Sequence, residues 1–164
     1  VLFVCNVDEA SAISGNKHSD AVLKALEGTD ASVLIVAGKL EAEIAELETI
    51  DERMEFLKDY GLTQPSVYTL IRAAYNMLNL HSFFTVGPKE IKAWTIKKGM
   101  TAPEASGVIH SDLQRGFIRA EVMRYDDFIK YGSENAVKEA GKFRVEGKTY
   151  VVNDGDIMHI RFNV

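Results

Sequence analysis

Apolar and polar positions alternate in blocks along the first 80 residues. Two short runs, 1–5 and 32–36, are almost wholly apolar, which is typical of strands buried on both faces of a parallel sheet. Residues 18–27 and 41–60 place apolar side chains at helical spacing, the second as a stripe on an acidic background. A further helix is predicted to begin at Pro65 and to extend to about residue 80. The order strand, helix, strand, helix predicts an α/β fold with parallel strands.

The second half of the chain follows a period of two. The pattern is clearest over 117–125, where Ile118, Ala120 and Val122 predict one buried strand face. Helical spacing is confined to 103–114, while residues 126–140 are predicted to be irregular to helical. Further strands are expected at 82–86, 90–97 and 157–164, with a hairpin formed by 143–146 and 149–152. Short strands with a single helix predict an α+β domain of the β-grasp type.

The net charge of −5 is unevenly distributed. Residues 1–80 contain six Lys or Arg and thirteen Asp or Glu, whereas residues 81–164 contain thirteen and eleven. Such a change in charge indicates two modules, and the acidic first half cannot bind phosphate polymers by bulk charge. We expect residues 1–62 to belong to the first domain, residues 63–80 to form a connecting helix and residues 81–164 to form the second domain.

Composition restricts the class of protein. Hydrophobic residues make up 46% of the chain and charged residues 26%, as in folded domains, and no apolar run reaches the roughly 18 residues of a membrane helix. Cys5 is the only cysteine, so an intramolecular disulfide is excluded. Because the chain opens at Val1 directly within a strand, we expect it to be the C-terminal part of a longer protein. The single cysteine fits a reducing compartment, so we expect a cytoplasmic protein, and we expect it to be a monomer.

Polar residues follow both predicted parallel strands. Asn6, Val7 and Glu9 lie just after the first strand, and Ala37 and Gly38 lie just after the second. Ligands of open parallel sheets bind at the carboxyl ends of the strands, so these residues are candidates to line one pocket. From the residues alone, a simple polar turn is the alternative.

Several motifs together resemble the Obg-like ATPase family, known in bacteria as YchF. The segment Asn6–Glu9 stands where GTP-binding P-loop proteins carry Asn-Lys-x-Asp, and Ala37–Lys39 stands where they carry a Ser-Ala-Lys loop. The more specific stretches lie downstream: Phe83–Gly87, Lys92–Thr95, Arg115–Val122 and Asp154–Met158. The resemblance implies the C-terminal part of a P-loop NTPase domain followed by a TGS domain of β-grasp fold.

The resemblance also implies ATP as the nucleotide, with GTP as an alternative, and Asn6 and the backbone around Val7 as contacts of the base. In Asn-Lys-x-Asp proteins the Asp carboxylate accepts two hydrogen bonds from guanine. Here that position is Glu9, whose extra methylene moves the carboxylate by about 1 Å, and the Lys position is Val7. A preference for guanine is therefore not expected.

No phosphate-binding loop is present in these 164 residues. Such a loop needs Gly-x-x-x-x-Gly-Lys-Ser/Thr, and none of the pairs Gly38-Lys39, Gly141-Lys142 and Gly147-Lys148 has that context. The ligands of the Mg²⁺ that such enzymes use are expected elsewhere in the complete protein. We therefore assign no catalytic or metal-binding residue, and we expect this chain alone not to hydrolyse ATP.

A second function class is a binding module for RNA or the ribosome. Aromatic and basic residues on a sheet can stack bases and bind phosphates, and TGS domains also occur in other proteins of translation. The alternative is that Trp94 packs in the core of its domain. The candidate residues are Lys92, Trp94, Lys97, Lys98, Arg119 and Arg124.

Overall fold

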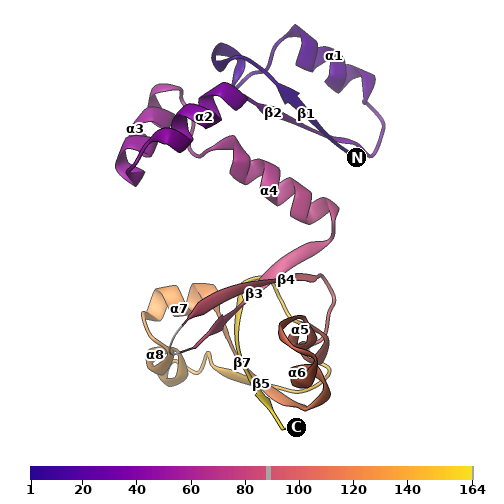
Figure 1. Ribbon diagram of the computed structural model, residues 1–164, viewed down its shortest axis with the longest axis vertical. Coiled ribbons are helices and arrows are strands. Elements are labelled where there is room, and N and C mark those ends of the chain that lie inside the picture. The colour runs from indigo at the N-terminus through magenta and orange to yellow at the C-terminus, as the bar shows by residue number, and fades with distance from the viewer. Residues whose placement is uncertain (88–89, 164) are drawn as a thin grey trace. The chain divides into compact units, whose positions relative to one another are not determined.

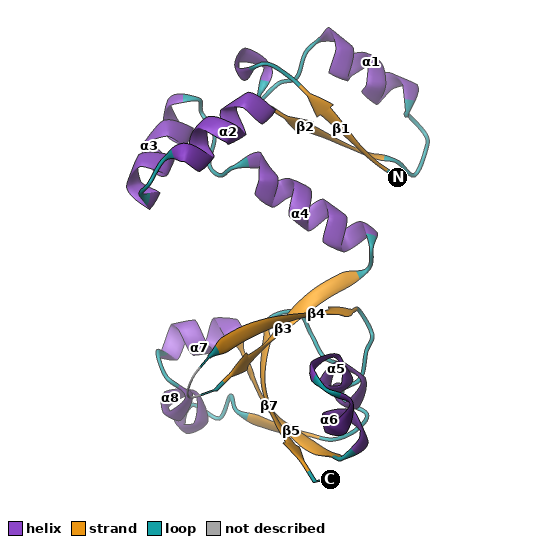
Figure 2. Ribbon diagram, in the orientation of Figure 1, coloured by secondary structure: helices purple, strands orange, loops and turns teal. Residues whose placement is uncertain are grey.

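The computed structural model describes residues 1–87 and 90–163, which form two units, Val1–Met77 and Leu78–Val164. The first unit contains a parallel pair of strands, β1 (Leu2–Asn6) and β2 (Ser32–Val36), with Leu2 opposite Ser32 and Asn6 opposite Val36. The parallel pairing expected from the two apolar runs is confirmed. Figures 1 and 2 show the elements of each unit. The domain boundaries expected from the sequence stay a prediction.

The helices of the first unit follow the strands in chain order. A short 3-10 helix, η1, occupies Glu9–Ser11. The α-helices of this unit are α1 (Lys17–Ala25), α2 (Gly38–Glu46), α3 (Ile50–Asp59) and α4 (Ser66–Met77). A small core joins the ends of the strands to α2 and α3, and its buried members are Val7, Ala37, Leu40, Ile44 and Leu57.

The single helix predicted over 41–60 is wrong, because the chain breaks between α2 and α3. Leu47 is extended, and Thr49 starts a new helix with a capping box. The Thr49 hydroxyl accepts from the Glu52 N–H at 3.2 Å, and the Glu52 carboxylate accepts from the Thr49 N–H at 2.9 Å. The predicted stripe also fails in part: Ile50 is 75% and Met54 52% exposed.

The second unit is built on a five-stranded sheet with the order β4-β3-β7-β5-β6. Its strands are β3 (Leu80–Val86), β4 (Ile91–Lys97), β5 (Phe117–Arg124), β6 (Arg144–Glu146) and β7 (Asp156–Phe162). Strands β3 and β7 are parallel, and the other neighbours are antiparallel. The helices are α5 (Ala102–Ile109), α6 (Ser111–Arg115), α7 (Tyr125–Tyr131) and α8 (Glu134–Glu139).

Helices cover both faces of this sheet, as Figure 2 shows with α5 and α6 on one side and α7 and α8 on the other. On the first face, Phe83, Val122 and Met158 pack with residues of α5 in the larger core. On the second face, Met123 and Ile157 pack with Val137 of α8. The sheet is therefore buried from two sides, which explains why strand β5 has apolar residues on both.

Three predictions for this unit are corrected. The helix over 103–114 is two helices, because His110 is extended and its Nδ1 accepts from the Asp112 N–H at 3.2 Å. The hairpin of 143–146 with 149–152 does not form: β6 pairs with β5, and Val151 bridges Thr101. Ile118 is 52% exposed rather than buried, because a bulge between Phe117 and Arg119 shifts the alternation of β5.

A buried carboxylate holds the start of β7. Asp156 is fully buried, and its Oδ2 accepts from the Tyr150 hydroxyl at 2.6 Å and from the Asn153 N–H at 2.9 Å. The guanidinium groups of Arg144 and Arg124 approach Oδ1 at 3.8 and 4.0 Å. A buried charge is tolerated only when such partners compensate it, so this cluster fixes the 150–156 segment against the sheet.

Removing one partner of this carboxylate should destabilise the second unit. We expect Tyr150→Phe to lower the free energy of unfolding by about 2 kcal/mol, because a charged acceptor loses a hydrogen bond inside the protein. Urea denaturation followed by the fluorescence of Trp94, the only tryptophan, reports on this unit. The matched control is Tyr125→Phe, a half-exposed tyrosine. Equal midpoints for the two variants would contradict the role given to Asp156.

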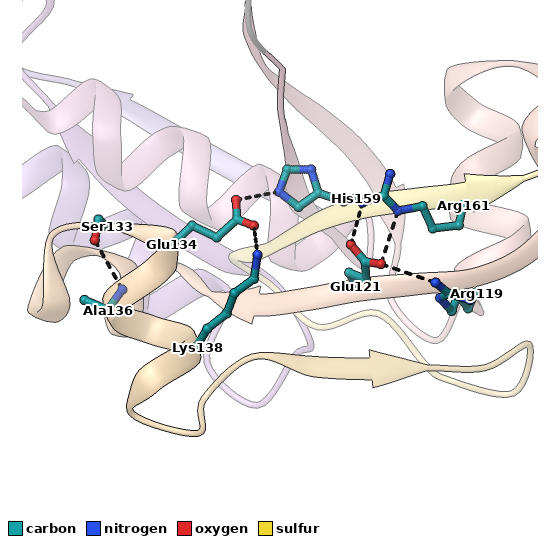
Figure 3. Close-up of polar contacts among 8 residues, drawn as sticks. All are labelled: Arg119, Glu121, Ser133, Glu134, Ala136, Lys138, His159 and Arg161. Carbon is teal, nitrogen blue, oxygen red and sulfur yellow. Dashed lines mark hydrogen bonds and ion pairs between the residues drawn. The ribbon is translucent and has the colours of Figure 1, made fainter.

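Charged side chains line the part of β5 and β7 next to α8 (Figure 3). Glu121 accepts from Arg161 at 2.8 and 3.2 Å, and Arg119 lies 3.7 Å from the same carboxylate. His159 lies 3.1 Å from Glu134. The hydrogen bond from Arg161 holds the pKa of Glu121 below its ordinary value. The charges of this strip thus pair with one another.

The pKa of Glu121 gives the stability of the second unit a defined dependence on pH. A carboxyl whose pKa is lower in the folded state contributes stability above its unfolded pKa, near 4.5, and loses it as the pH falls through the folded value. We expect Glu121→Gln to be less stable than the parent at pH 7, with the gap closing in acid. Urea denaturation at several pH values measures this, with Glu139→Gln as the control. A gap that does not change with pH would contradict the assignment.

Candidate functional site

The two segments singled out in the sequence meet at one edge of the β1–β2 pair. Asn6 ends β1 opposite Val36, and the Val7 N–H donates to the Val36 carbonyl at 2.9 Å. Beyond the strands, the Gly38 N–H donates to Asn6 Oδ1 at 2.9 Å. The parallel pairing therefore brings Asn6 and Gly38, 32 residues apart in the chain, into direct contact.

Glycine at position 38 allows this close approach. A Cβ atom at Gly38 would lie 3.0 Å from Asn6 Oδ1, tighter than most van der Waals contacts. Gly38 is also the first residue of α2, so its N–H is one of those that a helix leaves without an intrahelical acceptor. The Asn6 side chain satisfies it, which leaves the Asn6 amide nitrogen for other acceptors.

Glu9 lies next to the second segment through an ion pair. Lys39 Nζ is 2.6 Å from Glu9 Oε1 and 3.8 Å from a carboxylate oxygen of Glu43. The hydrogen bond to Glu9 and the charge of that carboxylate raise the pKa of Lys39. An exposed pair of this kind stabilises the fold little, but it directs the Glu9 carboxylate toward Lys39. The site assignment made from the sequence omitted Lys39, although it directly follows Ala37 and Gly38.

Val7 and Ala37 anchor the site in the core of the first unit. Both are buried, at 9% and 4% exposure, in the core that contains Leu40 and Ile44. The Val7 side chain therefore packs in the core, and the Val7 N–H is bonded to Val36. The Val7 carbonyl is the backbone group of this residue that can bind a ligand. A cleft of ≈ 430 Å³ borders Asn6, Val7 and Asn16, within the range of about 300–1,000 Å³ in which small ligands bind.

The basic residues proposed for nucleic acid do not form one patch. Lys92 Nζ lies 4.2 Å from the centre of the Trp94 ring, and Trp94 Nε1 donates to Thr85 Oγ1 at 2.9 Å. Strands β3 and β7 separate these residues from Arg119 on β5. Arg119 pairs with Glu121 (Figure 3), and Arg124 lies near buried Asp156.

The register also separates the lysines of β4 from one another. Lys92 and Trp94 lie opposite Thr85 and Phe83, on the face of the larger core, so both side chains share that face. Lys97 lies opposite Leu80, on the other face, and Lys98 follows the strand. Only Lys92 and Trp94 are thus brought together among the six candidates.

Two further properties limit the chemistry available to the described residues. No group of three or more His, Cys, Asp or Glu residues in ranges 1–87 and 90–163 is arranged to hold a metal ion. Within the same ranges, no helix has the length and apolar character needed to cross a membrane. The arrangement at the β1–β2 edge can bind part of a ligand through amide and carbonyl groups.

The chain is similar to known proteins over nearly its whole length. The family model YchF-GTPase_C, described as a protein of unknown function, matches residues 80–163. The "Ribosome-binding ATPase YchF" of Haemophilus ducreyi is 51% identical over 99% of this chain and 44% of its own length. "Obg-like ATPase 1" of Rattus norvegicus is 43% identical over 99% of this chain and 41% of its own length.

A solved structure agrees with these sequence relatives. The YchF GTPase of Schizosaccharomyces pombe has a TM-score of 0.86 and 33% identity, covering 98% of this chain and 43% of the other. The chain therefore spans less than half the length of the relatives it matches. With a family model over residues 80–163 and relatives along the full chain, this protein belongs to the YchF or Obg-like ATPase family.

Proposed function

We propose that this chain is the base-contacting end of a nucleotide site in a protein that binds and hydrolyses ATP. The observation that carries the proposal is the junction of Asn6 with Gly38, beside a Glu9 carboxylate that is held by Lys39. It stands at the carboxyl ends of two parallel strands, where nucleotides bind in open sheets. The names of relatives, ATPase in the sequence matches and GTPase in the solved structure, support a nucleotide.

The ion pair between Lys39 and Glu9 supports adenine over guanine. Recognition of guanine by a carboxylate needs two parallel hydrogen bonds from the base to two free oxygens, at about 2.7–3.2 Å. Glu9 has one oxygen 2.6 Å from Lys39, and its side chain is longer than the Asp that suits this geometry. Adenine has no such pair of donors, so it places no demand on Glu9.

Each contact to the base has a defined source in this proposal. The Asn6 amide nitrogen is the donor, because its Oδ1 is occupied by Gly38. The Val7 carbonyl is the acceptor, because its N–H is bonded to Val36. Phosphates and Mg²⁺ require residues outside this chain, which lacks a phosphate-binding loop, and this chain therefore supplies no catalytic residue.

The second unit is proposed to be the TGS domain, of β-grasp fold, and to take part in ribosome association in the cytoplasm. The support is a mixed sheet with helices on both faces, together with the names of the ribosome-binding relatives. As a second candidate function, this unit acts as a regulatory module that binds RNA or the ribosome, with the nucleotide as a switch. The contact of Lys92 with Trp94 favours it, since such pairs offer a stacking surface.

Truncating the Asn6 side chain tests the nucleotide site. In the complete protein we expect Asn6→Ala to weaken ATP binding by about 10- to 100-fold, because a donor to the base is lost and the Gly38 N–H loses its acceptor. Isothermal titration calorimetry measures the affinity. The matched control is Asn135→Ala, an exposed asparagine of α8, which should bind as the parent does. Unchanged affinity for Asn6→Ala would refute the assignment.

Shortening Glu9 tests the choice of base. We expect Glu9→Asp to release the carboxylate from Lys39 and to raise the affinity for GTP relative to ATP, because the shorter side chain suits a bidentate contact with guanine. Glu43→Asp is the control, since Glu43 also faces Lys39 but lies within α2. Competition between labelled ATP and GTP gives the ratio. An identical ratio in both variants would show that Glu9 does not govern the selection.

A further inference from the structure

Strand β4 forms an open edge of the sheet in the second unit. It spans seven residues, Ile91–Lys97, and pairs on one side only, with β3. The pairing runs without a shift from Leu80 opposite Lys97 to Val86 opposite Ile91, so no bulge interrupts it. A long and regular edge is a ready template for another strand, and natural sheets usually protect such edges.

The hydrogen bonds at the two ends of the β3–β4 ladder show which groups of β4 point outward. The Lys98 N–H donates to the Asn79 carbonyl at 2.8 Å, and the Gly87 N–H donates to the Glu90 carbonyl at 2.9 Å. In an antiparallel pair, residues alternate between bonding the neighbour and facing away. Residues Ile91, Ala93 and Lys97 therefore direct their N–H and C=O groups away from β3.

The side chains of β4 differ in chemistry between the two faces of the sheet. Ile91, 74% exposed, and exposed Ala93 lie on one face. Lys92 lies on the other face over the Trp94 ring, whereas exposed Lys97, at the far end of the strand, shares the face of Ile91 and Ala93. Neither Lys92 nor Lys97 forms an ion pair with a carboxylate within the part of the chain that the structure describes. The edge therefore offers strand pairing, a small apolar surface and uncompensated positive charge.

We propose that β4 binds an extended segment of a partner protein as an additional strand, and that this segment alternates apolar and acidic side chains. Its backbone pairs with Ile91, Ala93 and Lys97, its apolar side chains lie against Ile91 and Ala93, and its acidic side chains project to the opposite face, where they approach Lys92. Main-chain bonds supply the affinity in this mode of recognition, and alternate side chains supply the selectivity. The inference is independent of the nucleotide site.

The charge of the edge selects this occupant over two others. A second copy of the chain pairing through β4 would bring the lysines of both copies together, which is unfavourable for like charges across strands. A nucleic acid would use the lysines, but it has no backbone N–H and C=O ladder to pair with the outward groups of Ile91 and Ala93. An acidic extended segment uses both features at once.

The decisive variant removes one outward N–H without disturbing the ladder to β3. Proline is tolerated at an edge position whose N–H faces solvent, so Ala93→Pro should fold while blocking an added strand. Ala93→Val keeps the N–H and is the matched control. The probe is a fluorescent peptide, acetyl-Glu-Val-Glu-Val-Glu-Val-Glu-amide, titrated into the full 164-residue chain by anisotropy. We expect Ala93→Pro to bind at least tenfold more weakly than the parent and Ala93→Val to bind like it.

Charge reversal tests the acidic preference. Lys92→Glu should weaken the peptide severalfold, whereas Lys142→Glu, an exposed lysine outside the strands, should not. In the parent, bound peptide should slow amide hydrogen exchange at Ile91, Ala93 and Lys97. The proposal would be overturned if the Glu-Val peptide did not bind, or if a peptide of the same length with Lys in place of Glu bound equally well. Dimers of the chain that form without peptide, detected by sedimentation, would also overturn it. If the peptide does not bind, and oligouridylate binds equally to the parent and to Ala93→Pro, the lysines would be assigned to nucleic acid instead.

Discussion

The candidate site depends on one hydrogen bond, from the Gly38 N–H to Asn6 Oδ1. It exists because β1 and β2 are parallel and in register, so that both strands end at the same edge. The bond uses the oxygen of the Asn6 amide and satisfies the first N–H of α2, and so it fixes which atoms of Asn6 are available to a ligand. The same start of α2 places the Lys39 side chain, which pairs with the Glu9 carboxylate and so sets where that carboxylate lies.

The second unit depends on a different constraint, which is the burial of the sheet from both faces. Two cores take apolar residues from both faces of β5 and β7. Charged residues of these two strands pair with one another, as Glu121 does with Arg161. In β4, Lys92 and Lys97 have no carboxylate partner among the residues that the structure describes, which gives the edge its distinct chemistry.

We thus propose different kinds of recognition for the two halves of the chain. In the first, a ligand meets side-chain and backbone groups at strand ends, which suits a small molecule such as a nucleotide. In the second, an open strand presents repeated main-chain groups over seven residues, which suits a polymer.

Sequence patterns alone located most of the strands and the candidate site, because both depend on short-range order. The apolar runs predicted β1 and β2, and the polar residues after them predicted Asn6 and Gly38. The break at Thr49 was missed, although the capping box of Thr49 and Glu52 is a local signal that could have located it. The bulge that exposes Ile118, the pairing of β6 with β5 and the separation of Arg119 from Lys92 were decided by tertiary structure. Those features depend on which strands become neighbours, and a periodicity within one strand carries no information about its neighbours.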